Sequence, residues 1–202
     1  MRRTDVIRRA LMVIAAVAVV TGPVVAADKF DLAALAALLA QRKSGEARFE
    51  ETRLVSGLEG PLFSSGTLTF TAPDAFARHT LQPRAESMAV QGNVMTLKRG
   101  GRSRQMTLDA VPELSMLVEA MRGTLTGDAV ALQKHFTTAV AGNAQGWKLT
   151  LVPRDRALGA QVREITIEGQ RADMRVVSLW LTGGDSSRMA IEPIEPVKTD
   201  RP

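Results

Sequence analysis

Apolar and polar residues alternate with a period of two through most of the chain after residue 44, a pattern typical of half-buried β-strands. Turn residues interrupt the alternation, and the pairs Gly92-Asn93 and Gly100-Gly101 are hairpin signals. We therefore predict about eleven short antiparallel strands. The strands with the clearest bounds are 76–82, 85–91, 94–98, 102–108 and 187–192.

Helical spacing replaces this alternation in two places, and it predicts three helices, over 31–43, 112–123 and 128–135. Asp31 can cap the first helix, and leucines then follow on one face. Gly123 is a natural C-terminal end for the second helix. The helices therefore form one segment before the strands and one helical pair that interrupts them.

Short, evenly spaced strands without an internal repeat indicate a barrel or a strongly curled sheet. The concave side of such a sheet is apolar and has to be covered by other elements. The predicted helices are the available covers. The fold class expected from the pattern is therefore mainly β, with helices packed on one face.

The first 27 residues have a different character from the rest of the chain. A basic head with four arginines precedes a short apolar run, a glycine–proline pair and a V-x-A end, which together are typical of a Sec-type signal peptide. A permanent membrane anchor is the competing interpretation, but the run is shorter than the ~20 residues that a spanning helix needs. We expect cleavage near Ala26 or Ala27, leaving residues 28–202 as a single exported domain in the periplasm.

Charge and composition give little support to a nucleic-acid partner. The 202 residues carry 26 Lys and Arg against 21 Asp and Glu, a formal charge of +5. Removing the signal peptide would lower the charge to about +2, so the high pI is partly a property of that segment. The absence of cysteine excludes disulfides, thiolate metal sites and a lipid-anchored cysteine.

Sequence motifs for catalysis are missing from the chain: it has no G-x-S-x-G, no P-loop and no H-E-x-x-H. His79 and His135 fall on different predicted elements. Glu50 and Glu51 are neighbours on a strand, so they point to opposite faces and cannot act together on one substrate. We therefore expect neither an enzyme nor a metal or cofactor site.

Several short motifs occur in a fixed order along the chain. They are Ala47-Arg48-Phe49, Gly66-Thr67-Leu68-Thr69-Phe70-x-x-Pro73, Phe76, Gln82-Pro83-x-x-Glu86-Ser87, a Gly92 turn leading to Leu97, Trp147-x-Leu-x-Leu-x-Pro153, and Ile165-x-Ile. Together with the helix before them and the central helical stretch, this set resembles the periplasmic lipoprotein carrier family LolA, and especially its divergent LolA-like members.

The resemblance implies an unclosed antiparallel β-barrel of about 11 strands, with an N-terminal helix and a central helical lid over an apolar cavity. It also implies a function: shielding the acyl chains of an outer-membrane lipoprotein. Cargo would come from an inner-membrane ABC transporter and pass to an outer-membrane acceptor. We expect the carrier to be a monomer.

One position departs from the family pattern. The family's characteristic arginine lies immediately before the proline after the second strand, where it holds the lid by hydrogen bonds, and Ala72 occupies the matching position here. Either the lid is held differently in this chain, or the cargo is not a lipoprotein. The departure favours a carrier of another lipid or a lipid-linked molecule. A sensing module that binds a lipid or lipoprotein on the same scaffold is a further alternative.

Alternation along the strands and the lid predicts which side chains face the cavity. Methionines recur among them, and methionine adapts to variable apolar shapes. An error of one residue in register would move a side chain to the other face. The predicted lining residues are Phe49, Leu68, Phe70, Phe76, Met88, Leu97, Met106, Leu117, Met121, Trp147, Leu149 and Ile165.

Overall fold

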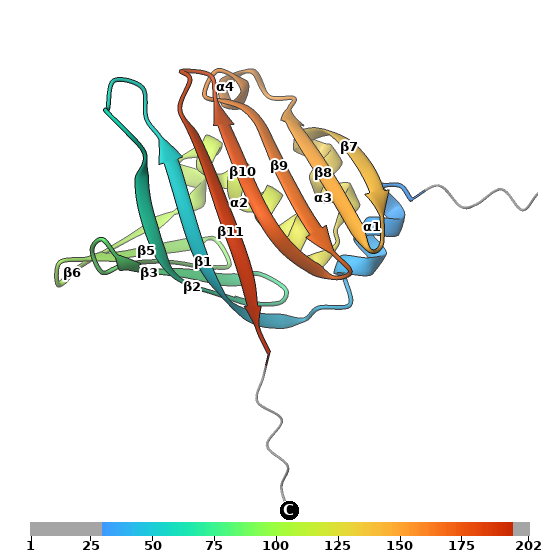
Figure 1. The fold of residues 1–202 in the computed structure, drawn as a ribbon, viewed down its shortest axis with the longest axis horizontal. Coiled ribbons are helices and arrows are strands. Elements are labelled where there is room, and N and C mark those ends of the chain that lie inside the picture. The colour runs from blue at the N-terminus through green and yellow to red at the C-terminus, as the bar shows by residue number, and fades with distance from the viewer. Residues whose placement is uncertain (1–29, 196–202) are drawn as a thin grey trace, which may run out of the picture.

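A computed structural model describes residues 30–195, which form one curved, unclosed antiparallel sheet of 11 strands (Figure 1). The strand order is β6-β5-β4-β3-β2-β1-β11-β10-β9-β8-β7, so the first and last strands pair in the middle of the sheet. This confirms the predicted fold class. The strands are β1 (Ser44–Leu54), β2 (Leu62–Thr71), β3 (Ala75–Gln82), β4 (Glu86–Gln91), β5 (Val94–Arg99), β6 (Arg102–Thr107), β7 (Phe136–Asn143), β8 (Gly146–Pro153), β9 (Val162–Gln170), β10 (Asp173–Leu181) and β11 (Ser186–Ile194).

The longer helices lie against one face of the sheet (Figure 1). Asp31 accepts a hydrogen bond from the Ala34 backbone N–H and caps α1 as predicted, and Asp128 caps α3 in the same way through the Ala131 N–H. No helix within residues 30–195 has the length and apolarity needed to cross a membrane. The helices are α1 (Leu32–Leu39), α2 (Pro112–Thr126), α3 (Ala129–His135) and α4 (Arg156–Gly159), with a 3₁₀ turn η1 (Leu108–Ala110) before α2.

The end of α2 differs from the prediction. The helix passes Gly123 and stops at Gly127, which takes up the left-handed conformation with φ of 70°. Gly123 has a packing role instead, because a Cβ there would lie 2.9 Å from the Leu132 side chain. Its missing side chain lets α3 lie close against α2.

The pairing of β10 with β9 is irregular between Met174 and Val176. Strict alternation would place Met174 and Val177 on opposite faces of the sheet. The shift adds one residue to β10, as a β-bulge does, and both side chains reach the concave side.

Two clusters of buried apolar side chains fill the space between sheet and helices. The first, which we call the packed core, lies between β7–β10 and the helices α1, α3 and α4, with α2 contributing one face. Its residues are Leu35, Leu39, Ala120, Leu132, Phe136, Trp147, Leu149, Leu151, Leu158, Val162, Ile165 and Ile167. The second, the lid-side cluster, lies between β2–β5 and α2 with η1, and consists of Phe70, Phe76, Val90, Met95, Leu108 and Val118.

Candidate functional site: an apolar cavity under helix α2

A cavity of about 290 Å³ lies between the concave face of the sheet and α2. Its walls are mainly aliphatic, aromatic and methionine side chains, which attract hydrocarbon and repel water. The cavity is about twice the volume of an engineered ~150 Å³ protein cavity that binds benzene. The apolar lining comes from β1–β5 (Ala47, Leu68, Phe70, Phe76, Met88, Met95), from α1 and α2 (Leu39, Leu114, Leu117, Val118, Met121, Leu125) and from residues in and near β10 and β11 (Ala172, Met174, Val177, Met189, Ile191, Pro193).

Charged residues mark one end of the cavity, where β1 begins. Arg42 and Asp173 both line it and form an ion pair with each other, and Arg175 lies 3.4 Å from the same aspartate. The side chains of Arg42 and Asp173 are 37% and 22% exposed, respectively. The apolar lining therefore meets solvent at this end, which we call the mouth.

Helix α2 is fastened to the sheet by one of its own side chains. Arg122 donates hydrogen bonds to the carbonyl oxygens of Gly92 and Asp74, in the turns β4–β5 and β2–β3. Ala72 offers only an apolar contact with the lid-side cluster. Helix α2 occupies the place of the predicted lid. In this chain the guanidinium that joins the lid to the sheet therefore belongs to the lid, at Arg122, and not to the sheet.

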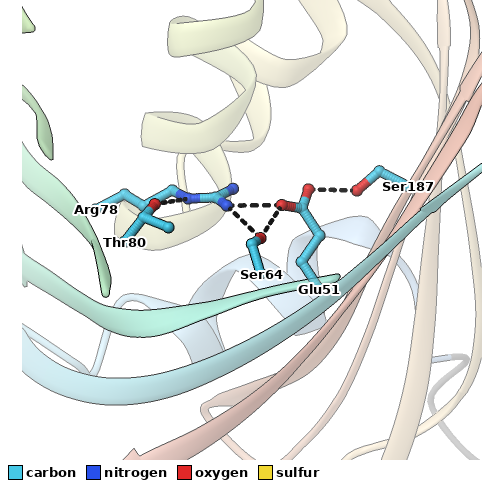
Figure 2. Close-up of polar contacts among 5 residues, drawn as sticks. All are labelled: Glu51, Ser64, Arg78, Thr80 and Ser187. Carbon is cyan, nitrogen blue, oxygen red and sulfur yellow. Dashed lines mark hydrogen bonds and ion pairs between the residues drawn. The ribbon is translucent and has the colours of Figure 1, made fainter. Parts of the chain in front are cut away.

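A polar cluster lies on the face of the sheet that looks toward the helices (Figure 2). Arg78 Nη2 donates to Glu51 Oε2 at 2.6 Å and to Ser64 Oγ at 3.0 Å, while Arg78 Nε donates to Thr80 Oγ1 at 3.3 Å. The hydroxyls of Ser64 and Ser187 donate to the two Glu51 oxygens at 2.9 and 2.5 Å. Four strands, β1, β2, β3 and β11, thus meet around one buried carboxylate.

The Glu51 carboxyl group keeps its charge in this setting. Burial works to raise its pKa, but the hydrogen bonds from Arg78 and Ser187, the charge of Arg78 and the Ser64 hydrogen bond together outweigh burial and lower the pKa. Glu51 and Arg78 therefore form a charged pair with no net charge.

The arginine reaches this carboxylate because the neighbouring strand has a glycine. Arg78 lies over the ring of Phe49, 4.4 Å from its centroid. That ring rests on Gly66, where a Cβ would lie 3.0 Å from the ring and 1.9 Å from the His79 carbonyl oxygen. Gly66 thus gives the ring and the arginine their positions.

Six of the predicted residues line the cavity: Leu68, Phe70, Phe76, Met88, Leu117 and Met121. Whether they contact a ligand stays a prediction.

The other predicted residues point inward but lie outside the lining. Trp147, Leu149 and Ile165 belong to the packed core, where helices cover β8 and β9. Leu97 and Met106 pack beside the lid-side cluster. Phe49 is 2% exposed and lies beneath Arg78.

The sequence analysis missed the wall formed by β10 and β11, including Met189 and Ile191. Their alternation was a usable signal, but nothing local shows that β11 pairs with β1. The two carboxylates Glu50 and Glu51 do face opposite sides, one exposed and one buried. Among residues 30–195, no three His, Asp or Glu side chains are grouped so that they could hold a metal ion.

Comparison with known proteins gives one family match. A family model described as outer membrane lipoprotein carrier protein LolA-like matches residues 24–192. No curated protein sequence matches the chain. Similar solved structures include a LolA-superfamily protein from Nitrosomonas europaea (8% identity, 82% of this chain and 93% of that chain, TM-score 0.43). Others are a putative outer membrane lipoprotein-sorting protein domain from Vibrio parahaemolyticus (9%, 83% and 93%, 0.42) and the lipoprotein LppX of Mycobacterium tuberculosis (13%, 83% and 98%, 0.37).

A curved antiparallel sheet that holds an apolar cavity beneath a helix is the architecture of a half-barrel binding protein. The family match covers most of the sequence, and the chain belongs to the LolA-like family of outer-membrane lipoprotein carrier proteins. The resemblance seen in the sequence motifs is thereby confirmed.

Proposed function

We propose that this protein is a periplasmic carrier that shields the acyl chains of a lipoprotein or lipid in the cavity under α2. The observation that carries the proposal is the cavity itself, about 290 Å³ of space with an almost entirely apolar lining. A sheet packed solid by its own side chains would have left no room for such a cargo. Here only the half covered by α1, α3 and α4 is packed in that way.

The energetics of the cavity suit a hydrocarbon chain. Removing an acyl chain from water is favourable by ~0.8 kcal/mol per CH₂ group, or on the order of 10 kcal/mol for a long chain. Five methionines line the space: Met88, Met95, Met121, Met174 and Met189. Their flexible thioether side chains can follow different chain conformations at small cost.

Release of such a cargo requires the lid to move. Among the described residues, the polar contacts of α2 with the sheet turns come from Arg122. Once these are broken, opening the lid separates the apolar contacts of α2 with the two clusters. Transfer to an acceptor that binds the acyl chain better would then complete the exchange.

The expected signal peptide supports a periplasmic location, and the direction of transport comes from the family resemblance. Residues 1–27 lie outside the described residues, so cleavage near Ala26 or Ala27 remains part of the proposal, as does a single mature domain over 28–202. The carrier would take its cargo from a donor at the inner membrane, such as an ABC transporter, and deliver it to an outer-membrane acceptor. It would do so as a monomer, without a metal or cofactor.

Direct titration of the mature protein with a fluorescent fatty acyl probe tests the proposal. Leu117→Arg places a charge in the apolar cavity, so we expect it to weaken binding at least about tenfold. Val130→Arg on the neighbouring helix α3 is the control, because Val130 is 79% exposed and lies outside the lining. Failure of the wild-type protein to bind any acylated probe would overturn the proposal.

The cargo class can be identified by mass spectrometry of lipids that co-purify from the periplasm. Recovery of acylated protein or lipid supports the carrier. Recovery of a stable regulatory partner without lipid would favour the sensing module instead.

A further inference from the structure

Arg78 has hydrogen-bonding capacity that the fold leaves unused. A guanidinium carries five N–H groups, and three of them are occupied by Glu51, Ser64 and Thr80. The remaining two are on Nη1, which makes no hydrogen bond to the side chains and backbone groups that the structure describes and is not sealed from solvent. In Figure 2 the guanidinium nitrogen without a dashed line faces the helices, toward the space between sheet and lid.

Arg78 also belongs to the wall of the cavity. In the sheet it pairs with Leu68 on β2 and with Met88 on β4, and all three residues line the cavity. The other charged lining residues, Arg42, Glu46 and Asp173, come from the mouth. A chain that fills the apolar space therefore lies beside one set of free donors, those of Arg78.

The charge of the cluster decides which acceptor suits those donors. Arg78 is already paired with the ionised Glu51 at 2.6 Å, so the site has no net charge to offer an anion. A carboxylate placed there would lie beside the ionised Glu51 with no net positive charge to balance it, so like-charge repulsion offsets the hydrogen bond that it would accept. A carbonyl oxygen needs only an N–H donor, and a donor on a charged group makes one of the stronger hydrogen bonds.

We propose that Arg78 is an anchoring residue for the carbonyl oxygen of an ester- or amide-linked acyl chain whose hydrocarbon part occupies the cavity. This inference rests on the proposed carrier function and narrows its cargo from hydrocarbon in general to neutral acyl groups. Glu51 acts through Arg78: it holds the guanidinium in place and cancels its charge.

Three twelve-carbon probes separate the parts of this inference in titration calorimetry of the mature protein. They are 1-monolauroylglycerol, 1-O-dodecylglycerol and laurate. The first two differ only in the carbonyl group, so we expect the ester to bind about tenfold more tightly than the ether. We expect laurate to bind more weakly than the ester.

The outcomes distinguish this inference from the carrier function. Equal affinity for ester and ether would overturn the anchor and leave the carrier standing. Failure of all three probes to bind would overturn both.

Two variants test whether the preference for the ester over the ether comes from Arg78 and Glu51. Arg78→Met should abolish the preference for ester over ether while the ether still binds. This variant leaves Glu51 buried without its partner and can fail to fold, so Glu51→Gln provides the second measurement.

The Glu51→Gln variant keeps a side chain of the same shape and gives the cluster a positive charge. The ratio of laurate to ester affinity should then rise about tenfold, since an anion now finds an unpaired guanidinium. An unchanged ratio in this folded variant would contradict the role of charge, and an intact ester preference in a folded Arg78→Met variant would remove Arg78 from the site.

Discussion

The two halves of the sheet have the same strand geometry but differ in what covers them. Over β7–β10, the helices α1, α3 and α4 join one face of α2, and Leu149, Leu151 and Leu158 are fully buried. Over β1–β5, α2 is the main cover, and a cavity of about 290 Å³ remains. The number of helices over the concave face, rather than the strands themselves, separates the solid half from the hollow half.

The packed core and the cavity lining also differ in the types of side chain that they contain. The packed core is made mostly of leucine, isoleucine and aromatic residues, whereas the cavity is lined by five methionines along with leucines and phenylalanines. Branched and aromatic side chains fill a fixed shape well, and methionine tolerates a variable one. The comparison predicts that the two halves respond differently to truncation of a large side chain.

The largest expected effect is on the packed core. Leu149→Ala should lower the free energy of unfolding by about 3 kcal/mol, because the side chain is fully buried and its neighbours cannot collapse into the space. Urea denaturation gives the value. Affinity for an acyl probe should be unchanged, and a loss of less than about 1 kcal/mol would show that this half is not rigidly packed.

The second-largest effect is expected at Arg122, which fastens α2 to the sheet. Arg122→Met removes the hydrogen bonds to Gly92 and Asp74, and should cost about 1–2 kcal/mol of stability. Cargo release should accelerate, which stopped-flow fluorescence with an acyl probe can measure. Arg84→Met, at an exposed position between β3 and β4, is the matched control. Equal release rates in both variants would exclude Arg122 as the fastening residue.

A methionine on the hollow side should matter less for stability. Met121→Ala should cost about 1 kcal/mol, well below the core substitution, because Met121 already borders empty space and loses fewer contacts. Thermal and urea unfolding of the two variants side by side measure the difference. A cost equal to that of Leu149→Ala would mean that the cavity region is packed as tightly as the core.

The smallest expected effect depends on pH. The pKa of Glu51 is lower in the folded than in the unfolded chain, so its contribution to stability is present above the ordinary carboxyl range. It is lost as pH falls through the folded-state pKa. Glu51→Gln should therefore show a shallower decline of unfolding free energy between about pH 5 and pH 3 than the wild type. Parallel curves would show that this carboxylate is not linked to folding.

Local patterns predicted most of the fold. The hairpins from β3 to β6 have bounds within one residue of those read from the sequence, because strand alternation and glycine turns are both short-range signals. The predicted end of α2 was wrong because Gly123 leaves space for Leu132 of α3 and does not end the helix. A glycine in a helical segment is a sequence signal both for the end of a helix and for close packing between two helices, so the sequence alone did not separate the two.

The cavity was harder to predict than the sheet. Alternation identifies inward-facing side chains, and Leu68 and Leu149 both satisfy it. Whether an inward residue meets a helix or a hollow depends on helices distant in sequence. The polar cluster was missed for a related reason: Glu51 and Ser187 are 136 residues apart, and only the β1–β11 pairing brings them together.

That central pairing has a consequence for the order of assembly. A chain that emerges from its amino end presents β1 early, yet the neighbour on one side of β1 is the last strand to appear. Until β11 arrives, the middle of the sheet stays open and Glu51 lacks one of its hydroxyl donors. A chain whose last strand has not yet appeared therefore lacks the part of the cavity wall that Met189 and Ile191 form.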